Sequence, residues 1–437
     1  MNRTATRLLI AGFAACLLGE ASSASAQGFD WKRHQGETID FLTENHPWSN
    51  AVVAQLPEFE KLTGIKVQVD TFQEQQMRQR LVTLLQSKSQ TVDAFMSLKS
   101  LEGRLYAHAG WYADLATLMH APGETAPDYD VADLSHALVA GETFAGRLDG
   151  IPLNIEGPIV YYRKDVFQKC GIPPPASLDA LMAAAAALHQ CEPTVIPWAT
   201  RGMKPALPYT FSNVLHNFGA DYLDAAGKPV LCDPAGINAI TWYADMLRQY
   251  GPPGAVNNSF LQTRELYGQG RAAMAFESSN EFGEMMKFPH RQDDTGVMLL
   301  PPGPGGASKP TVIGWGLSLS AFSTKTPAAW YFVQWATSKE MDAHLALQGI
   351  APPRDSVANS AEYMAWLHQV PVRQDWAGLL KQMGATGTSE VGPPLDRQPQ
   401  AREIVGDAVD SVLLGQASAH DAACNADKQI AAMQAEK

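Results

Sequence analysis

The sequence has few cysteines, no excess of basic residues and no long hydrophobic run, and each absence excludes a class of protein. Its 437 residues include five cysteines, and acidic residues outnumber basic ones by 45 to 33. Because no basic run offsets this acidity, we do not expect nucleic acid or anionic membrane surfaces as partners. No apolar stretch after the N-terminal segment reaches the roughly 18 residues of a membrane-spanning helix, so we expect the remainder of the chain to be soluble.

Residues 1–26 have the pattern of a secretory signal peptide. Arg3 and Arg7 precede an apolar run over residues 8–18, and small residues follow at 24–26. The run is too short to span a bilayer, so we expect cleavage before Gln27 and a periplasmic location; an uncleaved N-terminal anchor is the alternative. Cleavage would change the formal net charge from −12 to −13, since it removes two arginines and one glutamate.

Motifs of common enzymes are absent from the sequence. There is no G-x-x-x-x-G-K-[ST] phosphate loop, no G-x-S-x-G nucleophile turn and no H-E-x-x-H zinc helix. The stretch "GQGRAA" at 268–273 precedes a strand rather than a helix, which is the wrong order for a dinucleotide-binding turn. The eleven histidines lack metal-ligand spacing. The sequence therefore predicts neither an enzyme nor a metal site nor a cofactor.

The rest of the chain alternates strand and helix patterns. Residues 38–43 and 65–72 predict strands, and residues 50–64 between them carry apolar side chains at helical spacing. Further patterns predict helices at 75–86, 178–190, 236–250, 402–414 and 419–435, strands at 93–98, 270–277 and 311–320, and a loop at 300–310. These βαβ units predict an α/β protein with parallel-rich sheets flanked by helices, and the length favours two lobes. Ligands of such sheets bind at the carboxyl ends of the strands.

Four stretches in particular resemble a known family. They are "FEKLTGIKV", "GIPLNIEGPIVYYRKDVF", "YGQGRAAMAFESS" and "GIAPPRDSV". Together they resemble the extracellular solute-binding proteins of bacterial ABC importers, in the family that carries sugars and polyols. The resemblance implies a two-lobed periplasmic binding protein type II fold, with one lobe at 27–154 and 303–352, the other at 155–302 and 353–437, and about three crossings between them. It also implies a monomer that binds a carbohydrate or polyol, delivers it to an importer permease and needs no cofactor.

Two residues at unusual chain positions are the leading ligand candidates. Gly157 and Pro158 are unfavourable inside a strand, and the resemblance places them at the first crossing, with Glu156 in the floor of the interlobe cleft. A carboxylate there can accept hydrogen bonds from sugar hydroxyls, whereas the alternative is a Glu paired with a hinge lysine or arginine. Trp315 lies between two glycines that permit a close approach, and its ring offers an apolar face to sugar C–H groups; a core role is the alternative.

Ten further candidates follow strand ends or match cleft positions of the family. They are Glu44, Asn45, Trp48, Ser97, Lys99, Arg201, Tyr209, Glu277, Ser278 and Arg354. Charged residues in turns are often only solvated, and Trp is usually core, so each has a structural alternative. Arg397 is a weaker candidate. In "FESSNEF", Asn280 stands where many relatives have an aromatic residue, which leaves the class of sugar open.

Two rival functions remain open from the sequence. Adjacent tyrosines ligate iron in ferric-ion carriers, and Tyr161-Tyr162 is such a pair, but a strand points neighbouring side chains to opposite faces. A secreted glycoside hydrolase would share the signal peptide, the acidity and the tryptophans.

Four cysteines remain after the predicted cleavage, and chain geometry favours one pairing. From Cys170 the chain runs outward for about seven residues, or roughly 23 Å at most, and the following helix returns about 19 Å. A disulfide between Cys170 and Cys191 is therefore feasible, which would leave Cys232 to pair with Cys424. Four separate thiols are the alternative, because four cysteines allow three pairings.

Overall fold

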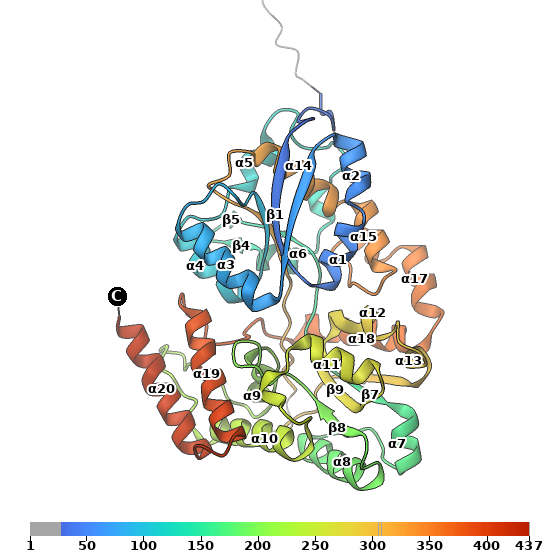
Figure 1. The fold of residues 1–437 in the computed structure, drawn as a ribbon, viewed down its shortest axis with the longest axis vertical. Helices are drawn as coiled ribbons and strands as arrows, with labels where there is room; N and C mark the ends of the chain where they lie inside the picture. The colour runs from blue at the N-terminus through green and yellow to red at the C-terminus, as the bar shows by residue number, and fades with distance from the viewer. Residues whose placement is uncertain (1–27, 305, 307, 437) are drawn as a thin grey trace, which may run out of the picture.

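The computed structural model describes residues 28–304, 306 and 308–436, so the predicted signal peptide lies outside the described residues. The chain forms two α/β lobes, one above the other in Figure 1. The strands are β1 (Thr38–Glu44), β2 (Lys66–Phe72), β3 (Ala94–Ser97), β4 (Thr143–Phe144), β5 (Arg147–Leu148), β6 (Ile151–Pro152), β7 (Pro158–Arg163), β8 (Ile196–Ala199), β9 (Ala272–Ser278), β10 (Thr295–Met298) and β11 (Gly316–Leu319).

The helices surround these strands. They are α1 (Pro47–Ala54), α2 (Leu56–Thr63), α3 (Glu74–Gln86), α4 (Arg104–His108), α5 (Leu115–His120), α6 (His136–Gly141), α7 (Lys164–Cys170), α8 (Leu178–Cys191), α9 (Pro208–Asn217), α10 (Pro234–Tyr250), α11 (Phe260–Gly268), α12 (Phe282–Met285), α13 (Arg291–Asp294), α14 (Thr326–Ala336), α15 (Lys339–Ala346), α16 (Asp355–Ala358), α17 (Ala361–His368), α18 (Pro371–Thr386), α19 (Gln398–Leu413) and α20 (Ala419–Ala435). In the described ranges, none of them has the length and apolar character needed to cross a membrane.

Each lobe is built on one mixed sheet. The N-terminal lobe has the strand order β2-β1-β3-β11-β6, in which β1 runs parallel to β2 and β3 whereas β11 is antiparallel to its neighbours. The C-terminal lobe has the order β10-β7-β9-β8, with β8 and β9 parallel and β7 antiparallel to β9 and β10. Both β7 and β11 begin at the crossings between the lobes, so they run away from the other lobe while β3 and β9 run toward it.

Separate hydrophobic cores hold the lobes. One core fills the N-terminal lobe around β1, β3, β11 and α14. The C-terminal lobe has two cores, one on each face of its sheet: Val160 of β7 belongs to the first, and its neighbours Ile159 and Tyr161 belong to the second. This alternation is the period-two geometry of a strand buried on both faces. The α/β class and the two lobes predicted from the sequence are confirmed.

The single helix predicted at 50–64 is wrong in one respect, because the chain breaks it at Gln55. Helix α1 ends there and α2 begins at Leu56, with Pro57 in its first turn. Proline has no N–H to donate and its ring clashes with the carbonyl four residues earlier, so one helix cannot run through Pro57 and a new helix begins one residue before it.

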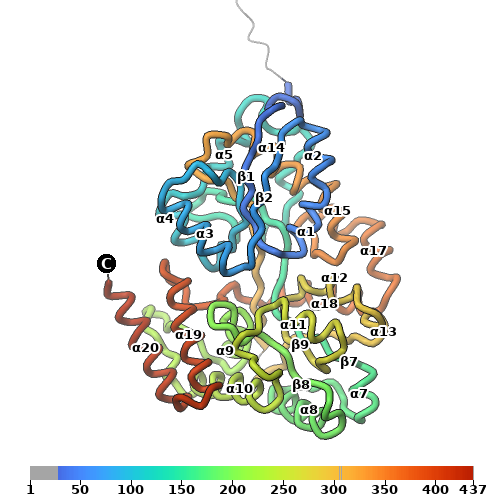
Figure 2. The backbone as a smooth tube through the Cα atoms, viewed as in Figure 1, coloured from blue at the N-terminus to red at the C-terminus, as the bar shows by residue number. Residues whose placement is uncertain are grey.

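Two crossing segments lie against each other between the lobes (Figure 2). Glu156 and Ile313 exchange both backbone hydrogen bonds, at 2.9 and 2.7 Å, and form an isolated bridge. The strand predicted at 311–320 is therefore shortened to β11, since its first residues pair at the crossing instead. A Cβ atom on Gly157 would lie 2.2 Å from the carbonyl oxygen of Thr311, which explains the glycine in this segment. A third connection leads from α15 to α16 and α17.

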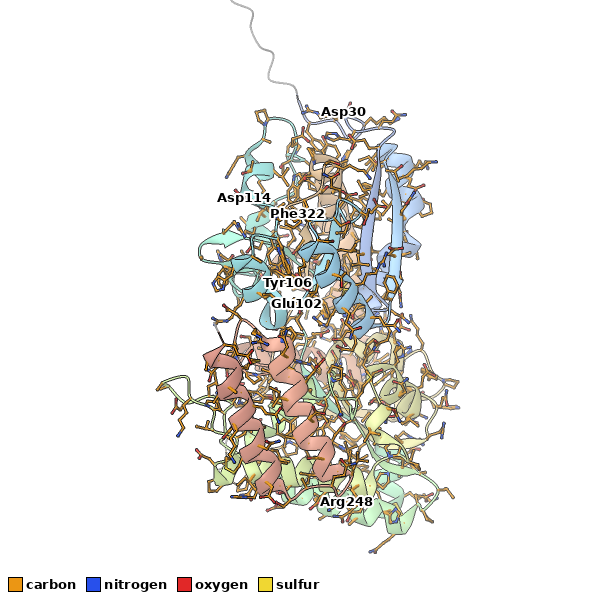
Figure 3. The ribbon with its side chains drawn as sticks, turned by 60° about the vertical axis from the view of Figure 1, so that its left-hand side comes forward. Asp30, Glu102, Tyr106, Asp114, Arg248 and Phe322 are labelled. Atoms are coloured by element: carbon orange, nitrogen blue, oxygen red, sulfur yellow. A yellow bond between two sulfur atoms is a disulfide. The ribbon has the colours of Figure 1, made fainter. Side chains whose placement is uncertain are left out.

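Two disulfides brace the C-terminal lobe. Cys170 at the end of α7 is joined to Cys191 at the end of α8, with a Cα–Cα separation of 5.9 Å. Cys232, just before α10, is joined to Cys424 of α20, with a Cα–Cα separation of 4.5 Å. The second bridge ties the C-terminal helices, which lie side by side in Figure 3, to the body of the lobe. Both pairings match those favoured by the sequence.

Replacing Gly157 with alanine should destabilise the protein by roughly 1–3 kcal/mol, because the new methyl group overlaps the Thr311 carbonyl. Thermal unfolding of Gly157→Ala against the wild type measures the effect. Gly378→Ala is the matched control: Gly378 is exposed within α18 with no atom within 4 Å of an added Cβ, so the same substitution should be neutral or stabilising there. Equal melting temperatures for both variants would contradict the close approach.

Loss of the Cys232–Cys424 bridge should destabilise the chain more than loss of Cys170–Cys191. The sequence separations are 192 and 21 residues. Loop-closure entropy then predicts about 5 and about 3 kcal/mol respectively. Denaturant unfolding of the two paired Cys→Ser variants checks the order, and non-reducing peptide mapping of the oxidised wild type checks the connectivity. Free-thiol labelling of any of the four cysteines would contradict the pairing.

Candidate functional site

A cavity lies between the lobes, where strand ends of both sheets meet the crossing segments. The space between its atoms, including the part open to solvent, is about 330 Å³. Its walls come from the ends of β1 and β9, the starts of α1, α3 and α11, helix α9 and both crossings. The lining residues are Glu44, His46, Glu74, Leu98, Glu156, Arg201, Tyr209, Phe260, Ser278, Glu281, Ile313 and Trp315.

The crossing segments position one acidic and one aromatic side chain in this cavity. The side chain of Asn154 bridges them: its Nδ2 donates to Glu156 Oε2 at 3.1 Å, and its Oδ1 accepts from the backbone N–H of Trp315 at 3.0 Å. A Cβ on Gly314 would lie 2.7 Å from the Asn154 carbonyl oxygen, so the glycine permits this approach. Glu156 and Trp315, from different crossings, are therefore held as one unit.

A chain of alternating charges runs across the interface between the lobes. In the N-terminal lobe, Arg78 donates to Glu74 at 3.0 and 3.2 Å and also pairs with Glu102, which lies at the edge of the upper lobe facing the lower one (Figure 3). In the C-terminal lobe, Arg201 donates to Glu277 at 2.6, 3.0 and 3.1 Å. Glu74 Oε2 lies 3.8 Å from Arg201, which joins the two halves.

The same arginines cover the aromatic rings of the site. The Arg201 guanidinium lies 4.1 Å from the ring centre of Tyr209 and 5.6 Å from that of Phe260. The Arg78 guanidinium lies 4.9 Å from the Trp315 ring centre. Each ring thus has a cation against one face, which stabilises the buried arginines and leaves less aromatic surface for a ligand.

A second polar contact joins the lobes at the top of the cavity. His46 caps α1 by accepting the backbone N–H of Trp48 at its Nδ1, 3.2 Å away. Its Nε2 lies 3.0 Å from Asn280 Nδ2 of the C-terminal lobe and 3.7 Å from Glu156 Oε2. Asn280 therefore supplies a polar interlobe contact.

Burial raises the pKa of two carboxyl groups in the cavity. The pKa of Glu44 lies well above its usual value because of burial and, next, the neighbouring Glu74. Burial raises the pKa of Glu281 to about 8, although Arg264 opposes the shift. By contrast, the pKa of Glu74 is lowered: burial acts to raise it, but Arg78 and Arg201 together outweigh that cost. The acidic groups therefore differ in how well cations compensate them.

The structure brings six of the twelve predicted ligand residues to the cavity wall. They are Glu44, Glu156, Arg201, Tyr209, Ser278 and Trp315. Glu277 lies directly behind Arg201 as its ion-pair partner and is fully buried.

The other predicted ligand residues take structural positions outside the cavity wall. Asn45 accepts a hydrogen bond from Asn50 on the surface side of α1, and Trp48 is buried in the N-terminal core. Arg354 is 1% exposed and donates to the carbonyl oxygens of Tyr129, Asp130 and Thr337, so its charge holds loops together. Arg397 pairs with Glu436 on the surface.

Lys99 and Ser97 form a separate buried cluster. Lys99 Nζ donates to Ser97 at 2.8 Å and to Ser318 at 2.7 Å, and lies 3.3 Å from Glu142. Lys99 lines a second space of about 1620 Å³ beside the crossings. That space is bordered by α6, the segment after β3, both crossings and residues 384–398, whereas the ends of β1 and β9, one from each sheet, converge on the smaller cavity, which is therefore the candidate site.

The adjacent tyrosines of β7 face opposite sides of the sheet. Tyr161 is buried and donates to the Ser278 carbonyl oxygen at 2.8 Å, whereas Tyr162 packs against Phe167 in the other core. Neither side chain lines the cavity. The paired iron-ligand geometry is therefore absent at this position.

Sequence reasoning missed His46, Glu74, Leu98, Phe260, Glu281 and Ile313, which also line the cavity. Three of these lie at or just before helix starts: His46 caps α1, Glu74 begins α3 and Phe260 begins α11. Their position at the start of a helix after a strand could have identified them, because such a helix begins at the sheet edge where ligands bind.

Comparisons with known proteins place this arrangement in a family. A sequence profile described as bacterial extracellular solute-binding protein matches residues 43–343. The mannitol-binding protein of Pseudomonas aeruginosa is 27% identical over 379 residues, covering 82% of this chain and 84% of that protein. The erythritol/L-threitol-binding protein of Mycolicibacterium smegmatis is 27% identical over 332 residues, covering 72% and 69%.

Solved structures agree with the sequence comparisons. The crystal structure of an ABC transporter solute-binding protein from Agrobacterium vitis, with bound D-mannitol, has a TM-score of 0.79 and 26% identity, covering 91% of this chain and 98% of that one. Maltose-bound T. maritima MalE3 has a TM-score of 0.80 at 21% identity, covering 91% and 99%, which supports the fold. The resemblance predicted from the sequence is confirmed. Since the profile covers more than half of the chain, this protein belongs to the bacterial extracellular solute-binding protein family.

Proposed function

We propose that this protein is the periplasmic substrate-binding component of an ABC importer, that it binds a small sugar or polyol in the cavity between its lobes, and that it delivers this ligand to the importer permease. The observation that supports the proposal is the mixture of groups contributed by both lobes and the crossings. Glu156 and Ser278 offer hydroxyl partners, while Trp315 and Tyr209 offer apolar edges. Carbohydrate recognition needs both kinds of contact.

The size of the cavity and its covered rings favour a short ligand. The cavity holds about 330 Å³ between its lining atoms, part of it open to solvent, which leaves no room for a long oligosaccharide. Arginines occupy one face of both Trp315 and Tyr209, so flat stacking of a pyranose has less surface available. A small polyol needs hydroxyl partners more than stacking faces, in keeping with the mannitol- and erythritol-binding relatives.

The two lobes act as halves of one site that closes by bending at the crossings. Glu44 and Trp315 belong to the N-terminal side, and Arg201 and Ser278 to the C-terminal side, so a bound ligand contacts both. It favours the closed arrangement because only that arrangement provides the full set of contacts. The protein is proposed to work as a monomeric carrier, exported by its N-terminal leader and without catalytic activity.

Substitution of the paired crossing residues tests the site. Glu156→Gln and Trp315→Ala should each weaken binding of the best ligand in a thermal-shift panel of mannitol, ribitol, erythritol and maltose by roughly 1–3 kcal/mol, because each removes one buried contact. Isothermal titration measures the loss. Glu340→Gln, on the exposed surface of α15, is the control and should bind as the wild type does. Unchanged affinity in both site variants would place the ligand elsewhere, and product release from oligosaccharides would favour a hydrolase.

Glu74→Gln tests whether the interlobe charge chain helps the lobes to close. The substitution removes the carboxylate between Arg78 and Arg201, so the closed form should lose stability and the Kd should rise about 5- to 150-fold. X-ray scattering at saturating ligand should show the wild type becoming more compact and the variant needing more ligand for the same change. Glu58→Gln on the exposed side of α2 is the control. X-ray scattering profiles of the wild type that stay the same with and without ligand would contradict hinge closure.

A further inference from the structure

We infer that the ligand carries an ammonium group together with its hydroxyls, so that the substrate class is an amino sugar or an aminated polyol; this inference rests on the proposed carrier function. The starting observation is Glu44 at the end of β1. Its side chain lines the cavity and is 1% exposed, and its Oε2 atom has no hydrogen-bond partner among the described residues. A buried carboxylate without a partner is costly, so an unpaired one in a ligand cavity indicates a partner that the ligand supplies.

The cations around the cavity are already committed to other carboxylates. Arg201 is bound by Glu277 through three short contacts, and Arg78 lies between Glu74 and Glu102. A third arginine, Arg264, lies 3.4 Å from Glu281 and is the cation nearest to it. The carboxylates of Glu74, Glu102, Glu277 and Glu281 are therefore each paired with an arginine.

Among the residues that the structure describes, two carboxylates of the cavity, those of Glu44 and Glu156, have no arginine or lysine partner. The charged groups that act on Glu44 are Glu74, Arg78, Glu156 and Arg201: the two arginines favour its ionisation and the two glutamates oppose it, and with burial the pKa of Glu44 stays raised. Glu156 has only Asn154 and, at 3.7 Å, His46.

His46 does not supply the missing charge in this arrangement. Its Nδ1 accepts the backbone N–H of Trp48, so the ring proton is on Nε2 and the imidazole is neutral. Exchanging the amide N and O of Asn280 lets Nε2–H donate to Oδ1, an oxygen that otherwise has no partner. The neutral ring then orients the site without neutralising Glu156.

A ligand ammonium between Glu44 and Glu156 satisfies both groups. The ammonium group donates up to three hydrogen bonds. Beside a neutral ligand one carboxyl group would stay protonated, whereas the charge of the ammonium group allows it to ionise. The hydroxyls of the same ligand then meet Ser278 and the edge of Trp315. Because burial and the neighbouring Glu74 raise the pKa of Glu44, binding of the cation releases a proton, and affinity should fall as the pH is lowered.

Matched ligand pairs test this inference on the mature, disulfide-bonded protein. The pairs are D-glucitol with 1-amino-1-deoxy-D-glucitol, D-mannitol with 1-amino-1-deoxy-D-mannitol, and D-glucose with D-glucosamine. Titration at pH 7 should show at least one amine binding about 10- to 100-fold more tightly than its hydroxyl partner, the range expected for a charge-assisted contact. Titration in two buffers of different ionisation enthalpy should show proton release, with no amine buffer present.

The Glu44→Gln variant assigns the preference to this side chain. The variant should lose most of the amine preference, while Glu340→Gln on the exposed surface should keep it. If the variant does not fold, the titrations of the matched ligands into the wild-type protein and the measured proton release still test the inference. Neutral ligands that bind as tightly as the amines would overturn the inference and leave the carrier function standing. No binding by any member of any pair, with none by ribitol, erythritol or maltose, would overturn both.

Discussion

The close approach of the two crossing segments is the constraint on which the site depends. Glu156 and Ile313 pair through their backbones, and no Cβ fits at Gly157 or Gly314 without displacing a carbonyl group of the facing segment. This pairing brings two side chains from distant parts of the chain, Glu156 and Trp315, to one cavity wall and lets Asn154 bind both. Hydroxyl recognition and apolar contact are thus positioned by the same backbone pair that connects the lobes.

Local signals in the sequence predicted much of this arrangement. Gly157 and Pro158, which are unfavourable inside a strand, marked the first crossing, and Gly314 beside Trp315 marks a close approach of the backbone to Asn154. Period-two patterning separated Tyr161 from Tyr162. Each of these features was marked by residue types at adjacent positions in the sequence.

Features that depend on side-chain direction could not be predicted in the same way. Trp48 and Tyr209 both stand near strand ends or cleft walls, yet Trp48 turns into the core and Tyr209 into the cavity. Arg354 satisfies carbonyl oxygens of two distant loops, a role that only tertiary packing reveals. Glu74 was missed because it looks like an ordinary acidic residue in the first turn of a helix, where it also favours the dipole. Its partner Arg201 lies in the other lobe.

Uncompensated acid in the cavity also gives the ligand control over the position of the lobes. Glu44 comes from the N-terminal lobe and Glu156 from the crossing between the lobes, and neither has an arginine or lysine partner among the described residues. Closing the empty site brings these groups together out of water, which raises the free energy of the closed form even though the Glu74–Arg201 pair favours it. A ligand that neutralises part of this acid removes the penalty only when the lobes are closed. The free-energy difference between the open and closed arrangements then depends on whether the ligand is bound. A carrier needs this dependence if an importer is to recognise its loaded form.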